Sequence, residues 1–273
     1  RVLFRSVRLM VWCRDIESGT DGRSRACGGG DSQHWNEYTL LMLQISLAQK
    51  IAAWLLPVLL AITVHETSHG LIARRLGDKT AEMLGRLTLN PLKHIDPVGT
   101  VLVPALMLLL PGGFVFGWAK PVPVDWRNLR RPKQDMAWVA AAGPASNLVM
   151  ALLWALLLRF ALGLSAENWF AMPLLFMGVA GIFINTILMV LNLLPLPPLD
   201  GGRVLTGLLP PAWAYRFARI EPYGLWILIA LLMTGVLGLI LWPFVSFFLN
   251  LLAGIAGMKP GYFQTILIAL TGG

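Results

Sequence analysis

Long uncharged apolar runs constrain this chain more than any other feature of its sequence. Residues 148–158, 174–194 and 225–241 contain no charged side chain, and polar or basic segments bracket each run. Only 13% of the 273 residues are charged, whereas a soluble domain carries about 25%. Such runs are typical of transmembrane helices. We therefore predict a polytopic, all-α membrane protein rather than a soluble protein with large buried helices.

The apolar runs and the residues that interrupt them predict a helical bundle with about four full spans. We expect long helices at 40–76, 136–162, 170–194 and 223–241. Repeated prolines at 195–198 end the third of these helices, because proline lacks a donor and disfavours the α conformation before it. Beyond the last helix, Pro243 and Gly254 are expected to break the chain into interfacial pieces.

Two shorter stretches are expected to behave differently from the spans. The apolar run at 98–110 would form about 20 Å of helix, which is too short for a hydrocarbon core of about 30 Å. We therefore predict that it is re-entrant. Residues 114–124 mix aromatic side chains, glycine and proline, and we expect extended or looped backbone there, as a short strand-like segment associated with the membrane.

The composition divides the chain into three parts. Residues 1–39 are polar, glycine-rich and mixed in charge, so we expect a disordered or non-native extension; Cys13 and Cys27, which lie in it, are assigned no role. The membrane domain is expected at 40–258 and a C-terminal tail at 259–273. The net charge of +8 comes largely from loops between apolar runs, a placement that favours the positive-inside rule over nucleic-acid binding.

A histidine pair in the first apolar run carries the chemistry. In His65-Glu66-Thr67-Ser68-His69, the two imidazoles are four residues apart and face the same side of a helix. That spacing suits two ligands of one Zn²⁺, with Glu66 alongside to take a proton from a bound water. Ionisable residues inside a span are costly and are functional candidates by default. The alternative is a pair of hydrogen-bonded core histidines.

A catalytic zinc needs a third protein ligand, and Asp200 is the leading candidate. It follows the proline run, and Gly201 and Gly202 behind it allow a close backbone approach; the alternative is a helix N-cap. If 98–110 is re-entrant, Asp200 reaches the membrane face near which His69 lies. Basic residues at 74–93, 120–133 and 203–219 gather on that face. The positive-inside rule then places the site toward the cytoplasmic side of the inner cell membrane.

Three motifs in order resemble the site-2 protease family of intramembrane zinc metalloproteases. They are the residues at 65–69, the Ala-Gly-Pro-Ala-Ser-Asn sequence at 142–147 and the segment at 192–202. Residues 117–124 are also similar to the strand-like segment of compact bacterial members. Many members carry a PDZ or CBS module, and neither is expected in these loops. We interpret the small residues at 143–146 as positions of close helix packing.

The resemblance implies cleavage of peptide bonds within or near transmembrane helices. It implies one Zn²⁺ per chain held by His65, His69 and Asp200, with Glu66 as the base. Asn192 and Asn147 match asparagines of the family and are candidates for contacts to the substrate or the oxyanion. For Asn147 we favour a structural role. The expected partners are a single-span membrane-protein substrate and the lipid bilayer. The chain could also form a homo-oligomer.

A metal-ion transporter is the alternative from another functional class. It would use the same His65, Glu66, His69 and Asp200 cluster as a transit site. Transport sites of this kind usually lie between inverted repeats, and the sequence shows no internal repeat. Three ligands beside a glutamate also suit hydrolysis better, so the sequence favours the protease.

Overall fold

The computed structural model describes residues 45–102, 119–165 and 167–271. This part of the chain is helical. Four of its helices are long and apolar enough to cross a membrane: α3 (Leu47–Leu76), α6 (Pro132–Leu162), α7 (Ala171–Asn192) and α11 (Val236–Ala256). The shorter helices are α4 (Thr80–Met83), η1 (Pro91–Lys93), the π-helix η2 (Pro97–Leu102), η3 (Trp126–Asn128), α8 (Asp200–Leu208), α9 (Pro211–Ala218), α10 (Glu221–Met233) and α12 (Pro260–Thr271). An all-helical fold with four candidate spans is confirmed.

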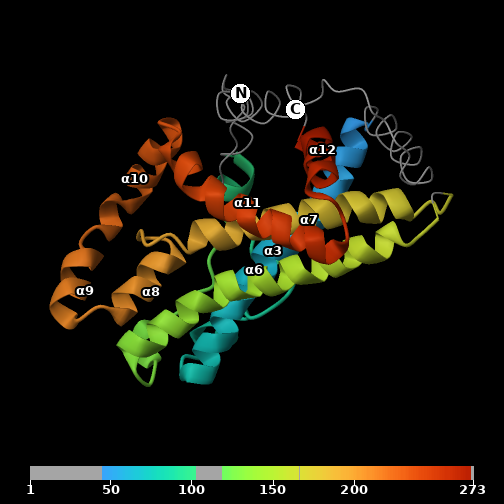
Figure 1. The fold of residues 1–273 in the computed structure, drawn as a ribbon. Helices are drawn as coiled ribbons and strands as arrows, with labels where there is room; N and C mark the ends of the chain where they lie inside the picture. Colours follow the sequence, from blue (N-terminus) through green and yellow to red (C-terminus); the bar gives the residue numbers. More distant parts are fainter. Residues whose placement is uncertain (1–44, 103–118, 166, 272–273) are drawn as a thin grey trace.

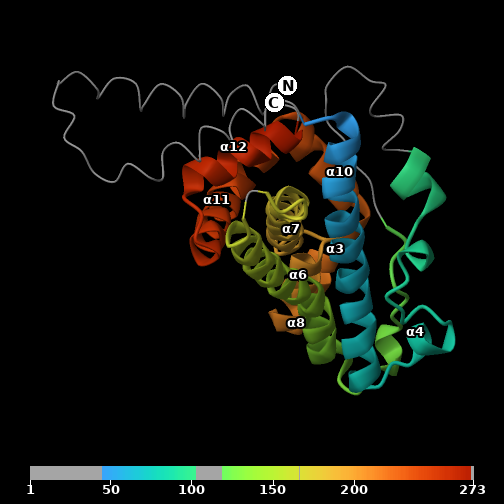
Figure 2. The ribbon, with the colours of Figure 1, turned by 90° about the vertical axis from the view of Figure 1, so that its right-hand side faces the viewer.

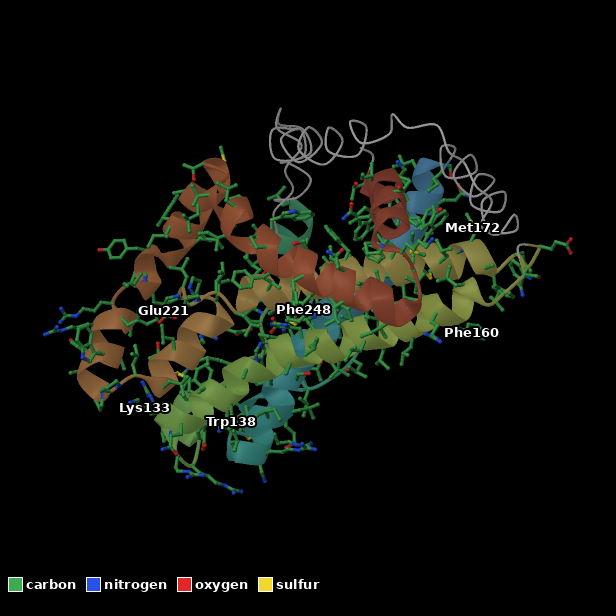
Figure 3. The ribbon with its side chains drawn as sticks, in the orientation of Figure 1. Lys133, Trp138, Phe160, Met172, Glu221 and Phe248 are labelled. Carbon is green, nitrogen blue, oxygen red and sulfur yellow. The ribbon has the colours of Figure 1, made fainter. Side chains whose placement is uncertain are left out.

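An antiparallel pair, α6 and α7, forms the centre of the bundle (Figure 1). Phe160 near the end of α6 and Met172 near the start of α7 lie at the same end of the pair (Figure 3). Helix α3 packs against both, with α11 on the same side as this pair and α4 on the opposite side of α3 (Figure 2). The core therefore lies between α3, α6, α7 and α11, with α12 adding to it.

The last part of the bundle differs from the prediction. The expected span at 223–241 is wrong, because the helix breaks at Gly235, whose φ of 76° lies in the left-handed region. Glycine adopts this conformation without steric penalty. The fourth candidate span is instead α11, which contains Pro243 within its length. Residues 259–273, set apart as a tail, include α12, which buries Phe263 and Ile266 in the main core.

The two shorter stretches are described in part. Of the predicted re-entrant run at 98–110, residues 98–102 belong to η2 and the rest lie outside the described residues. Of the predicted strand-like segment, 119–124 are described and form no strand. Pro121 and Pro123 explain this, since proline cannot donate a hydrogen bond to a strand ladder.

Asp78 joins the end of α3 to the residues that lead into α6. Its Oδ1 accepts hydrogen bonds from the Thr80 N–H at 3.0 Å and from Asn128 Nδ2 at 3.2 Å, and its Oδ2 accepts from the Asp125 N–H at 2.8 Å. Burial raises the pKa of this carboxyl, but the hydrogen bonds outweigh it and hold the pKa below its usual value. Hydrogen bonds to the ionised form have this effect.

We expect Asp78→Asn to destabilise the protein in a pH-dependent way. Because the folded-state pKa is depressed, the stabilisation is present above the unfolded value of about 4 and is lost as pH falls toward the folded value. The difference in thermal midpoint between wild type and Asp78→Asn in detergent should therefore shrink as pH falls from 6 to about 3. Glu82→Gln, at an exposed pair with Arg74, is the control. A constant difference for Asp78→Asn would contradict the assignment.

Candidate metal centre

The two histidines of α3 lie one helical turn apart and face each other. Their Nε2 atoms are 3.1 Å apart. The His65 side chain is buried and that of His69 is half-buried. The spacing along the helix, predicted to bring both imidazoles to one side, has this result because residues i and i+4 share a helix face.

Asp200 reaches this pair from α8. Its Oδ2 lies 3.2 Å from His65 Nε2 and 3.4 Å from His69 Nε2. This oxygen is buried without a hydrogen-bond partner, so the alternative of a plain helix cap finds no support. A Cβ added at Gly201 would lie 2.4 Å from the Leu193 carbonyl oxygen. The glycine thus permits the close backbone approach that carries Asp200 into the site.

One stripe of α6 supports the histidines. The Nδ1 of His69 donates to the Val139 carbonyl at 2.7 Å, and the Nδ1 of His65 donates to Asn147 Oδ1 at 2.5 Å. Between these two residues, a Cβ at Gly143 would lie 2.5 Å from His69 Nε2 and 2.6 Å from His65 Nε2. Close packing at 143 was predicted, but its partner is the imidazole pair rather than an ordinary helix face.

Asn185 of α7 completes the support of His65, and the sequence reasoning missed it. Asn147 Nδ2 donates to Asn185 Oδ1 at 2.9 Å and to the Ala61 carbonyl at 3.3 Å. Asn185 Nδ2 in turn donates to the Gly181 carbonyl at 2.9 Å. The Ala61 carbonyl and Asn185 Oδ1 both accept from the amide nitrogen of Asn147. The amide oxygen of Asn147 must therefore face His65. An asparagine in the middle of an apolar span was the available signal.

Three acceptor atoms therefore converge on one point. Both Nδ1 atoms donate elsewhere, so in the neutral imidazoles both Nε2 atoms carry lone pairs, and the third atom is a carboxylate oxygen. Neighbouring ligand atoms around a tetrahedral Zn²⁺ are about 3.3 Å apart, given bond lengths of about 2.0–2.1 Å. The separations of 3.1, 3.2 and 3.4 Å match this spacing. The residues present thus fit a zinc ion.

Glu66 and Asn192 lie outside this triangle of ligand atoms. Glu66 is half-buried on α3, and its Oε2 accepts a hydrogen bond from the Val122 N–H at 2.8 Å. Asn192 is the last residue of α7, and its Nδ2 donates to the Leu188 carbonyl at 2.9 Å, one turn earlier. Glu66 thus directly follows His65 in α3, and Asn192 lies where the chain leaves α7 toward Asp200.

Comparison with known sequences agrees with this geometry. The sequence model of peptidase family M50 matches residues 53–172 and 163–235, which include His65, His69 and Asp200. No solved structure matches the chain significantly.

Relatives in two bacterial groups resemble the chain over most of its length. The protein named "Putative zinc metalloprotease YwhC" of Bacillus subtilis is 38% identical over 191 residues, covering 69% of this chain and 84% of the relative. "Putative zinc metalloprotease Rip2" of Mycolicibacterium smegmatis is 36% identical over 190 residues, covering 68% and 67%. Rip2 of Mycobacterium tuberculosis H37Rv is 30% identical over 203 residues, covering 71% and 72%.

We expect Gly143→Ala to remove the metal. The added methyl group would lie 2.5–2.6 Å from atoms of both imidazoles, far inside van der Waals contact, so α3 and α6 would have to separate or the rings would have to turn. Zinc content, measured by plasma mass spectrometry on the purified protein, should fall from about one per chain to well below half. Gly254→Ala, where an added Cβ meets nothing within 4 Å, is the matched control. Full zinc content in Gly143→Ala would contradict this packing.

Proposed function

This chain belongs to peptidase family M50, and we propose that its zinc is held by His65, His69 and Asp200, with Glu66 as the general base. It is an intramembrane zinc metalloprotease. The convergence of three acceptor atoms, with no donor among them, is the observation that carries the ligand assignment. The same comparisons leave the metal-ion transporter without support.

The reaction needs a nucleophile and a route for one proton. A Zn²⁺ held by these residues would lower the pKa of a water molecule and polarise the scissile carbonyl. Glu66 accepts the proton of this water at Oε1, since its Oε2 already accepts the Val122 N–H. It then donates the same proton to the leaving amine nitrogen, as a general acid.

Asn147 is proposed as a positioning residue rather than a substrate contact. Its oxygen holds the His65 ring and both of its amide hydrogens have acceptors, so it has no group left to offer to an oxyanion. Such an outer partner fixes the tautomer and orientation of a metal-bound histidine. Asn192, which is half-buried and not engaged with the ligands, remains the proposed substrate or oxyanion contact.

The substrates of an intramembrane protease are membrane proteins, and we propose single-span proteins cleaved within or near the transmembrane helix. The carbonyls of a helix are hydrogen-bonded and shielded, so the substrate has to unwind locally before attack. We also propose that the site faces the cytoplasm, because the loops near it are basic. Arg74 and Arg75 lie in the last turn of α3, on the side of His69, and Lys133 lies in the first turn of α6, on the side of Val139.

We expect Glu66→Gln to separate metal binding from catalysis. The change removes the base and no ligand, so zinc should stay near one per chain while cleavage of a reconstituted membrane-helix substrate falls at least about 100-fold. Asp200→Ala is the complementary variant and should lose both zinc and activity, because two imidazoles alone hold zinc poorly. Cleavage by Glu66→Gln at the wild-type rate would rule out the proposed base.

The orientation can be measured with single cysteines in a variant that lacks Cys13 and Cys27. A membrane-impermeant thiol reagent applied from the periplasmic side should leave cysteines at 86, 130 and 216 unlabelled and should label one at 167. The reason is that basic loops remain cytoplasmic. Labelling at 130 with protection at 86 would show that 98–110 crosses the bilayer, contrary to the proposed topology.

A further inference from the structure

We propose that His94 is a positioning residue for catalysis: it holds residues 120–122 against α3 so that the Val122 N–H fixes the Glu66 carboxylate. This inference rests on the proposed role of Glu66 as the base. His94 lies outside the metal cluster, yet only 2% of it is exposed. A closed series of contacts, which starts and ends at the turn of α3 that carries Glu66, connects His94 to this carboxylate.

The first contact is between Val122 and Glu66. In Lys120-Pro121-Val122-Pro123 the two prolines have no N–H, so Val122 carries the one donor of 121–123. This N–H donates to Glu66 Oε2 at 2.8 Å, and the Val122 side chain is buried. Proline fixes its own φ and restricts the residue before it. The direction of this donor is therefore set by the sequence around it.

The second set of contacts comes from the loop at 86–94, which holds the residues immediately before Val122. The His94 carbonyl accepts the Lys120 N–H at 2.9 Å. The Arg86 guanidinium donates to the carbonyls of Lys120 at 3.1 Å and of Pro121 at 3.4 Å. Both sides of the Lys120 peptide backbone are thus bound to one loop, so the place of Val122 depends on the place of that loop.

The third set binds the loop to α3. The Thr88 carbonyl accepts hydrogen bonds from His94 Nε2 and from Thr67 Oγ1, both at 2.9 Å. Thr67 directly follows Glu66 in α3. The series of contacts therefore closes on the turn of helix that carries the base, and the His94 imidazole is the side chain that links the two ends of the loop.

This series of contacts has a consequence for the reaction. A glutamate side chain has several rotatable bonds, and a general base has to lie within hydrogen-bond reach of the proton that it accepts. With Oε2 held by Val122, the other oxygen has a defined direction. Releasing the segment would leave the metal ligands in place, because these contact α6 and α8 rather than the loop.

Two substitutions of His94 test the role of its ring donor. His94→Leu has similar bulk and no donor, whereas the amide nitrogen of His94→Gln can reach the Thr88 carbonyl as Nε2 does. We expect His94→Leu to lower kcat about 10-fold or more, with KM within about twofold of wild type and zinc near one per chain. His94→Gln should recover most of kcat. Leu92→Ala, at a side chain 73% exposed in the same loop, is the control.

Amide hydrogen exchange tests this series of contacts without a measurement of activity. In His94→Leu the Val122 amide should exchange faster than in wild type. The Asp125 amide, held independently by Asp78, should keep its protection. Unchanged exchange at Val122, an unchanged kcat in His94→Leu, or a His94→Gln variant no better than His94→Leu would each overturn the proposal. If Glu66 were not the base, Glu66→Gln would still cleave the substrate. The exchange rate of the Val122 amide would still show whether His94 holds Val122, so the two failures can be told apart.

Discussion

Burying two neutral imidazoles and a carboxylate with their acceptor atoms facing one another is unfavourable unless a cation lies among them. In this protein the Nδ1 atoms of both histidines donate to α6, so neither Nε2 can donate to Asp200 while the rings are neutral. A zinc ion held at the proposed site would therefore stabilise the packing of the helices as well as serve the reaction. Metal binding and folding are coupled where a site is built in this way.

The three residues of the proposed metal site could be found in the sequence because their signals are local. A spacing of four residues brings His65 and His69 to one helix face in any α-helix. Asp200 needed one further step, the argument that it ends on the same membrane face as His69. Asn185 and Gly143 could not be assigned in this way. Their roles depend on which turn of α7 meets which turn of α6, and that register is not contained in either helix alone.

The fold, like the site, could be predicted where its signals lie in one stretch of sequence. Hydropathy located the first three long helices, because polar residues or prolines mark their ends. It did not locate the break at Gly235, since the apolar run continues through it and the break is an event of the backbone. Nor did it show that Phe263 belongs to the core, because a short apolar helix near the end of a chain carries no sign of its packing partner.

The antiparallel crossing of α3 and α6 explains why a single glycine is needed in this site. His65 pairs with Asn147 and His69 pairs with Val139, so one helix is followed forward as the other is followed backward. Residue 143 lies midway between the two partners on α6 and must face the gap between the two rings. Each ring spans the distance from its partner on α6 to the shared metal position. The imidazoles therefore set the separation of the helices, and no side chain beyond a hydrogen atom fits at the crossing point.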